Sequence, residues 1–201
     1  NAISLDINKK SIHEETYTLQ VDSNRVIIRG MSNRAIGHGI QTFRQLLPDA
    51  FFKQEKRSNW YVPSVKISDT PQFNHRGMLL DCSRHFFEKS TLFKYIDLLS
   101  FYKMNVLHWH LTDDQGWRIE MDAYPQLTTI GAWRTEPNGE RYGGFYTKDD
   151  IREIVAYAAE RNITIIPEIE LPGHAQAAIA AYPHLSCTGD SVAVVNDWGV
   201  F

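Results

Sequence analysis

The ten residues HWHLTDDQGW, at positions 108–117, combine two histidines, two aspartates and two tryptophans. Aspartate carboxylates can act as acids or bases, or can fix the tautomer of an imidazole. His108 and His110 lie two residues apart, so they share one side of an extended strand and could hold a metal ion. The segment therefore raises three kinds of chemistry: acid–base catalysis, a carboxylate–histidine relay and metal binding.

Three residues elsewhere in the chain suit the same chemistry. Arg84, in SRH, keeps its charge, and its rigid fork fits vicinal hydroxyls, a carboxylate or a phosphate. Glu170, in EIELPGH, is a candidate partner that could hold this guanidinium in place. His174 follows a Pro-Gly turn, and pairing with Asp113 would fix its tautomer and leave its other nitrogen for a third group.

Three apolar runs of strand length precede these residues: 76–83, 105–112 and 163–170. Helical patterns separate them, which predicts a parallel α/β sheet whose carboxyl ends share one edge. The polar residues expected to gather there are Arg84, Asp113, Asp114, Glu168, Glu170 and His174. A (β/α) barrel and a doubly wound sheet both fit, although neither GxGxxG nor GxxxxGK[ST] occurs, which disfavours nucleotide binding.

The two helices between these strands have recognisable starts. Ser90 can cap the first, which carries Leu92, Ile96 and Leu99 on one face. Thr147 and Asp150 form a capping-box-like start for the second. Its buried stripe is expected to comprise Ile151, Ile154, Val155 and Ala158.

Side chains alternate between the two faces of a strand, so Asp113 is expected on the opposite face from His108 and His110. If Asp113 points into the pocket and no bulge intervenes, His108 and His110 face the surrounding helices. We therefore expect a hydrogen-bonded pair of histidines rather than a metal site. Trp109 and Trp117 are expected to pack.

Residues 1–68 are predicted to form a separate small α/β domain. Residues 15–30 contain two β-rich runs joined by Asp-Ser-Asn, which indicates a hairpin. Residues 36–47 then show helical spacing up to Pro48, and 60–67 form a further strand whose Pro63 favours a sheet edge. The stretch SDTPQF is a plausible join to a second domain at 69–201.

Composition narrows the class of protein. The chain has 201 residues, is 43% hydrophobic and carries a formal net charge of −3, so it has no basic stripe for nucleic acid. Its apolar runs are too short for a bilayer span. Both ends look cut from a longer sequence. Cys82 is expected to be a buried apolar residue, and Cys187 lies in a loop where a disulfide to a more distant residue is conceivable.

Three long motifs together resemble the β-N-acetylhexosaminidases of glycoside hydrolase family 20: RGMLLDCSRHFF, KMNVLHWHLTDDQGWRIEMDAYPQLTTIGAWR and IIPEIELPGHAQAAIAAYP. The resemblance implies about three strands of a TIM (β/α)8 barrel, preceded by a small α/β domain. It also implies removal of terminal β-linked N-acetylglucosamine or N-acetylgalactosamine from glycans, with no cofactor or metal, in a secreted, periplasmic or lysosomal setting.

In such enzymes the substrate's own acetamido oxygen attacks the anomeric carbon. By motif, the resemblance implies that Arg84 binds the C3 and C4 hydroxyls, and that Asp113 holds His174, which supports the acid glutamate. The chain departs from the family in one respect. Family members carry an Asp-Glu pair, and this chain has no Asp-Glu dipeptide. We therefore expect the isolated chain to be inactive and, with open strand edges, to associate with itself.

Three alternatives remain open. One is another barrel glycosidase that uses Asp113 or Asp114 with Glu168 or Glu170. A second is a metal-dependent hydrolase built on the histidine pair and an acid. The third is a non-catalytic fragment that binds sugar or serves in assembly.

Overall fold

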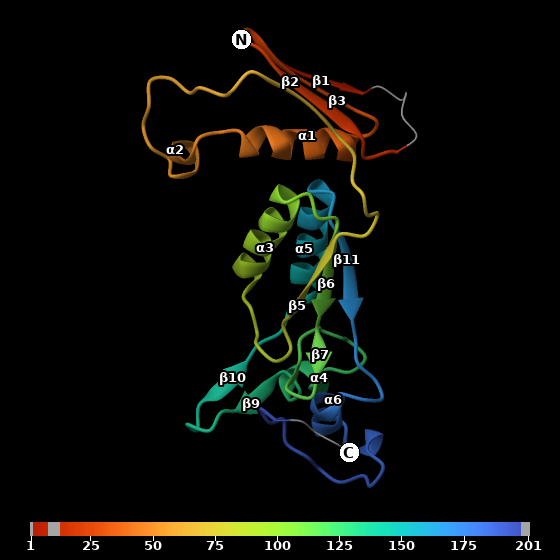
Figure 1. Ribbon diagram of the computed structural model, residues 1–201. Helices are drawn as coiled ribbons and strands as arrows, with labels where there is room; N and C mark the ends of the chain where they lie inside the picture. Colours follow the sequence, from red (N-terminus) through yellow and green to blue (C-terminus); the bar gives the residue numbers. More distant parts are fainter. Residues whose placement is uncertain (1, 8–12, 198–201) are drawn as a thin grey trace. The chain divides into compact units, whose positions relative to one another are not determined.

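The turn Asp22–Ser23–Asn24 joins two antiparallel strands, as the sequence predicts. The computed structural model describes residues 2–7 and 13–197 (Figure 1). In it β2 (Tyr17–Val21) pairs with β3 (Arg25–Gly30), and β1 (Ala2–Ile7) runs parallel to β3. The fourth strand, β4 (Val65–Asp69), pairs with β2 at the edge of the sheet, and it begins only after Pro63.

Helix α1 (Asn33–Gln45) packs on this sheet. Ser32 caps it, because its hydroxyl accepts a hydrogen bond from the backbone N–H of Ala35. A short helix, α2 (Asp49–Phe52), begins directly after Pro48. The core between sheet and helix consists of Tyr17, Leu19, Val21, Ile28, Ala35 and Ile36. These elements belong to the first of two compact units, which comprises residues 1–76 and 100–103.

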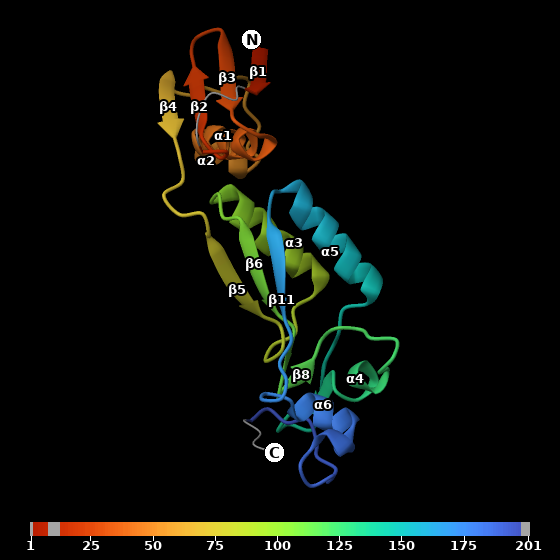
Figure 2. The same ribbon diagram turned by 90° about the vertical axis from the view of Figure 1, so that its right-hand side faces the viewer.

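The second unit, residues 77–99 and 104–201, contains a parallel sheet. Its strands are β5 (Gly77–Asp81), β6 (Val106–His110) and β11 (Thr164–Glu168), with β6 in the middle. Their carboxyl ends all point the same way (Figure 2).

Helices α3 (Lys89–Phe101) and α5 (Lys148–Glu160) both lie on one side of the parallel sheet (Figure 1). Thr147 and Asp150 form the predicted capping box. Two details differ from expectation: Ser90 lies inside the first turn of α3 rather than capping it, and Val155 is exposed. The shared core contains Leu92, Ile96, Leu107, Trp109, Leu111, Ile154 and Ala158.

The middle of the other side of this sheet is exposed within residues 77–197. Leu79 is 49% exposed and Ile166 is 45% exposed, although both lie on strands. Helices on one side only fit a barrel wall better than a doubly wound sheet, which has helices on both sides. None of the helices in the described residues combines the length and apolarity needed to span a bilayer.

Short elements and loops lie beyond the carboxyl ends of the parallel strands (Figure 2). They are β7 (Thr112–Asp113), β8 (Gly116–Trp117), α4 (Gln126–Thr129), β9 (Trp133–Thr135), β10 (Arg141–Gly143), α6 (Gln176–Ala181) and the 3-10 turn Pro183–Leu185. Cys82, at the end of β5, is buried as expected, and its sulfur accepts a hydrogen bond from the indole of Trp109. Cys187 is exposed, and both thiols are free.

Candidate functional site

The predicted site residues meet at the carboxyl edge of the parallel sheet. Arg84 follows β5, Asp113 follows β6, and His174 follows β11. Arg84 Nη2 lies 2.7 Å from Asp113 Oδ2, and His174 Nδ1 lies 3.2 Å from Asp113 Oδ1. Each carboxylate oxygen of Asp113 therefore binds a different cationic or polar partner.

Asp113 is the most deeply buried of these residues, with 1% of its side chain exposed. A buried carboxylate needs hydrogen bonds and opposite charge to offset the loss of water. In addition to Arg84 and His174, Asp113 receives a hydrogen bond from the backbone N–H of Asp114 at 2.7 Å. His110 Nε2 lies 2.9 Å from Oδ2 of the same carboxylate. Asp113 thus has four partners from three different segments.

The prediction that His108 and His110 face the surrounding helices is wrong. Both His108 and His110 contact Glu168 Oε2, at 2.7 and 2.6 Å, so they lie on the face opposite to α3 and α5. The neighbours Leu107, Trp109 and Leu111 fill the helix-facing core instead. The prediction failed because β6 ends at His110 and Asp113 belongs to a separate short strand, so alternation does not continue to Asp113.

Arg84 is held by several groups besides Asp113. Its Nη1 donates to Asp81 Oδ2 at 2.8 Å, and its Nε donates to Gln115 Oε1 at 3.1 Å. Asp81 Oδ1 also accepts hydrogen bonds from the backbone N–H groups of Ser83 and Arg84, both at 3.0 Å. This is an Asx turn, a signal that is visible in the sequence as an aspartate two residues before a serine. The side chain of Arg84 is 35% exposed, so the guanidinium also reaches solvent.

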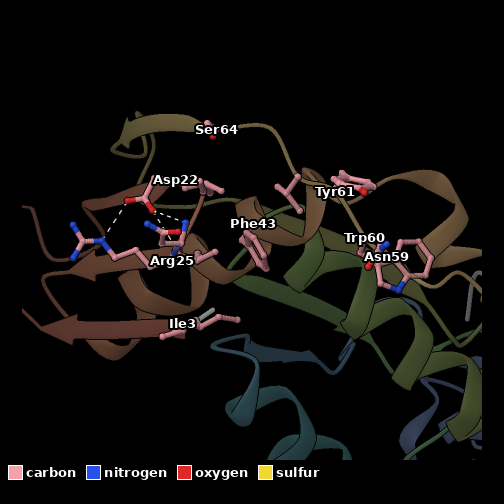
Figure 3. A pocket seen from close by; sticks show the side chains of 14 residues that line it. Ile3, Asp22, Arg25, Phe43, Asn59, Trp60, Tyr61 and Ser64 are labelled. Atoms are coloured by element: carbon pink, nitrogen blue, oxygen red, sulfur yellow. Dashed lines mark hydrogen bonds and ion pairs between the residues drawn. The ribbon is translucent and has the colours of Figure 1, made fainter.

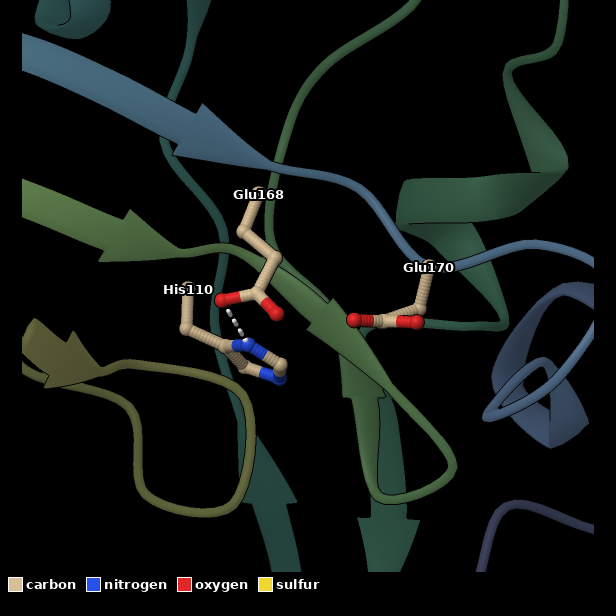
Figure 4. Close-up of side chains that lie close together, drawn as sticks. All are labelled: His110, Glu168 and Glu170. Carbon is tan, nitrogen blue, oxygen red and sulfur yellow. Dashed lines mark ion pairs between the residues drawn. The ribbon is translucent and has the colours of Figure 1, made fainter.

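Glu168 and Glu170 lie close together beside His110, whose Nδ1 is 2.6 Å from Glu168 Oε2 (Figure 4). Burial acts to raise the pKa of the Glu168 carboxyl, but hydrogen bonds from His110 and Glu170 and the nearby histidine charges outweigh it, so the pKa is lowered. The pKa of Glu170 is raised, first by its hydrogen bond to Glu168, then by burial and by the Glu168 charge. The two carboxyls therefore titrate as a pair, in which Glu170 binds a proton more readily than Glu168.

The backbone of Glu170 is fixed by a hydrogen bond from its N–H to Thr112 Oγ1 at 2.8 Å. Its carboxyl approaches Glu168, while Arg84 has the partners described above. The pairing of Glu170 with Arg84 stays a prediction.

His174 reaches Asp113 from an unusual backbone conformation. Its φ angle is +53°, in the left-handed region that costs a residue with a side chain about 1 kcal/mol or more. Gly173 precedes His174, and no atom lies within 4 Å of the position that a Cβ would take there. The ion pair with Asp113, and a longer approach to Asp114 Oδ2 at 3.8 Å, offset this backbone strain.

Two buried arginines that the sequence did not single out fix the loops around the site. Arg118 is fully buried and donates to the carbonyls of Cys82, Ser83, Gln115, Ala132 and Gly144. Burial, and then the charge of Arg134, lower its pKa to about 10, so it remains a cation at neutral pH. Arg134 donates to the carbonyls of Arg84 and Gln115. Because their partners are backbone atoms, no residue pattern in the sequence predicts these contacts.

Two groups of side chains bring three potential metal ligands within 4.8 Å of one another: His110 with Glu168 and Glu170, and Asp113 with Asp114 and His174. The guanidinium of Arg84 lies 2.7 Å from Asp113 and 3.3 Å from His110 Nε2. A fixed positive charge at these distances repels a second cation. The geometry therefore favours a hydrogen-bonded network over a metal centre.

Sequence comparison assigns the chain to a known group. Residues 73–200 match the glycosyl hydrolase family 20 catalytic domain, and residues 1–70 match domain 2 of the same family. The chain belongs to glycosyl hydrolase family 20. A β-hexosaminidase of Porphyromonas gingivalis is 46% identical over 202 residues, which cover 100% of this chain and 26% of that protein.

Solved family 20 structures share the fold. The β-N-acetylhexosaminidase of Streptomyces coelicolor superposes with a TM-score of 0.90 at 42% identity, over 96% of this chain and 39% of that one. An exo-β-N-acetylglucosaminidase of Vibrio harveyi, solved with N-acetylglucosamine, gives 0.84 at 41% identity, over 90% of this chain and 29% of that one. The chain thus spans less than half the length of these family 20 relatives, and β5, β6 and β11 with α3 and α5 are part of a family 20 (β/α)8 barrel.

The raised pKa of Glu170 leads to a pH-dependent stability. The folded state binds a proton at Glu170 more tightly than the unfolded state, so its contribution is fully present below the unfolded pKa and is lost as pH rises through the raised pKa. Glu170→Gln is close in shape to glutamate and does not titrate. We expect the urea midpoint of the unchanged chain to fall relative to that of Glu170→Gln as pH rises above the ordinary glutamate pKa of 4.5.

Glu160→Gln, on the exposed surface of α5, is the matched control. Its urea midpoint should follow that of the unchanged chain across the same pH range. Parallel curves for Glu170→Gln and the unchanged chain would show that folding does not raise the pKa of Glu170.

Gly116 is required by the close approach of Arg118. A Cβ atom at position 116 would lie 2.2 Å from Arg118 Nη2, so alanine must displace the guanidinium from its carbonyl partners. We expect Gly116→Ala to lower the free energy of unfolding by about 2 kcal/mol, measured by urea denaturation. Gly173→Ala, where nothing lies within 4 Å of the new Cβ, should change it by less than about 0.5 kcal/mol. Equal effects of the two substitutions would contradict this account.

Proposed function

We propose that this chain is the front part of a β-N-acetylhexosaminidase, an enzyme that removes terminal β-linked N-acetylglucosamine or N-acetylgalactosamine from glycans and glycoconjugates. One observation carries the proposal: in a family 20 sequence, a buried Asp113 binds both Arg84 and His174 at the carboxyl edge of the parallel strands. Relatives named β-hexosaminidase and N,N'-diacetylchitobiase support the same substrate class.

In this proposal Arg84 binds the C3 and C4 hydroxyls of the terminal sugar. Its guanidinium is partly exposed while Asp81, Asp113 and Gln115 fix its orientation. A donor group held in place before the substrate arrives loses little conformational entropy on binding. The proposed role of Glu170 is to position Arg84.

Asp113 and His174 would support the acid that protonates the leaving oxygen. In this proposal His174 donates Nδ1–H to Asp113, and its opposite ring nitrogen serves the acid carboxyl group. That glutamate, and the aspartate that orients the acetamido group, belong to an Asp-Glu pair that does not occur within these 201 residues. The acetamido oxygen of the substrate then attacks the anomeric carbon as the glycosidic C–O bond breaks, so no nucleophile from the protein is needed.

We also propose a division into an N-terminal α/β domain at 1–68 and the beginning of the catalytic barrel at 69–201. The family matches at 1–70 and 73–200 support a boundary in this region. The first compact unit, whose main segment runs to Arg76, also supports it.

Asp113→Asn tests the relay in the longer protein that contains this chain. Asparagine cannot neutralise Arg84 and is a weaker hydrogen-bond acceptor for His174 than a carboxylate, so we expect kcat/KM for p-nitrophenyl N-acetyl-β-glucosaminide to fall about 100-fold. Asp122→Asn, an exposed aspartate that pairs with Lys148, is the matched control and should leave kcat/KM within about twofold.

Two results would contradict the proposed mechanism. One is an Asp113→Asn enzyme with unchanged kcat/KM. The other is equal cleavage of p-nitrophenyl β-glucoside, which lacks the acetamido group and would favour a glycosidase that uses two carboxylates of its own.

The isolated 201-residue chain should behave differently from the longer protein. It has no Asp-Glu pair, and Leu79 and Ile166 are exposed on the side of the sheet opposite to α3 and α5. We expect no hydrolysis of the same substrate, and self-association measured by light scattering after size exclusion. A monodisperse monomer that hydrolyses the substrate would refute this prediction.

A further inference from the structure

A cavity lies within the first unit, at the end of the sheet where β2 turns into β3 (Figure 3). Its volume is about 640 Å³, which falls in the range of pockets for organic ligands and is far larger than an ion site. The apolar part of its lining includes Val21, Val26, Phe43 and Val62. No residue of the Asp113 network lines it.

Two adjacent aromatic side chains border this cavity. Tyr61 is 79% exposed and Trp60 is 39% exposed, and both are among the lining residues (Figure 3). Trp60 is braced by Phe51, which packs edge-on with ring centroids 5.6 Å apart, and by the guanidinium of Arg57 at 6.0 Å from its ring centroid. Adjacent exposed aromatic faces beside a cavity can serve as contact surfaces for a ligand, because burial on binding removes apolar area from water.

The polar part of the lining consists of groups that donate or accept several hydrogen bonds. Asp22 Oδ1 accepts the backbone N–H of Asn24 at 2.9 Å and that of Arg25 at 3.1 Å, which fixes the hairpin turn. Arg25 pairs with Asp22 through Nε at 3.3 Å, and its two terminal nitrogens carry further N–H donors. Asn24 adds a side-chain amide at the hairpin turn, and Asn59 adds another beside Trp60 (Figure 3).

The charges of this lining cancel. Asp22 and Arg25 are the two charged residues among those that line the cavity, and they form an ion pair. A phosphate or carboxylate ligand would meet the Asp22 carboxylate, and a cation would meet the Arg25 guanidinium. An uncharged ligand with many hydroxyls, and with an apolar face to lie on an aromatic ring, fits better.

We propose that this cavity is a carbohydrate-binding site for a β-linked oligosaccharide. Equatorial substituents give such sugars a flat C–H face that can stack on Trp60 or Tyr61, while their hydroxyls and acetamido groups reach the amides and the guanidinium. The site lies in the first unit and uses none of the residues to which the proposed function assigns a catalytic or substrate-binding role. It would bind a glycan without cleaving it, and the inference does not depend on the proposed hydrolytic activity.

Titration calorimetry of the 201-residue chain with N,N',N''-triacetylchitotriose tests this site. We expect weak binding that Tyr61→Ala reduces about tenfold, through loss of one stacking surface. Because Tyr61 is 79% exposed, its removal leaves the core intact. Tyr102→Ala, an exposed tyrosine that does not line the cavity, is the matched control and should bind as the unchanged chain does.

Hydrogen exchange measured by mass spectrometry locates the bound sugar. The trisaccharide should protect backbone amides in 21–26 and 59–64, and Arg84→Gln should leave this protection unchanged. No detectable heat at millimolar trisaccharide would overturn the inference. So would binding that Arg84→Gln abolishes and Tyr61→Ala leaves intact, which would place the sugar at the Asp113 site instead and leave the proposed function standing.

Discussion

The carboxylate of Asp113 sets the strongest constraint on the second unit. With 1% of its side chain exposed, it cannot be solvated by bulk water and must be neutralised by protein groups. Those groups come from the loop after β5, from β6 and from the loop after β11, so all three strands must end at the same edge. Arg84, His110 and His174 thereby join segments that are far apart in the sequence, and the ion pairs select one arrangement of the loops.

The register of the parallel sheet places further polar side chains beside this network. Asp81, His110 and Glu168 are direct neighbours across the three strands, so their side chains leave the sheet on one side in a single row. The next row on the same side lies two residues earlier in each strand and contains Leu79, His108 and Ile166. In this second row His108 also contacts Glu168, while Leu79 and Ile166 on either side of it are apolar. A register shift of one residue would place Trp109 in this row and move the histidines into the helix-facing core.

Much of this architecture could be predicted from the sequence, because apolar runs and caps are local signals. The three parallel strands, the capping box at Thr147 and the meeting of Arg84, Asp113 and His174 follow from such signals. The direction of His110 could not be predicted, since it depends on the strand ending before Asp113. Arg118 could not be found either. Its partners are five carbonyls from separate loops, and their positions exist only once the chain has folded.

The surroundings of Arg84 also distinguish between the three kinds of ligand that a guanidinium can bind. Two carboxylates, Asp81 and Asp113, lie within 2.8 Å of its terminal nitrogens. A phosphate or carboxylate ligand at the same fork would therefore be repelled by two fixed negative charges in a partly buried setting, where screening by water is weak. Hydroxyl groups carry no charge and meet no such repulsion. They can still accept hydrogen bonds from the N–H groups of Arg84 and donate a hydrogen bond to a neighbouring carboxylate. The charge balance around this one arginine thus favours hydroxyl groups over an anion as its ligand.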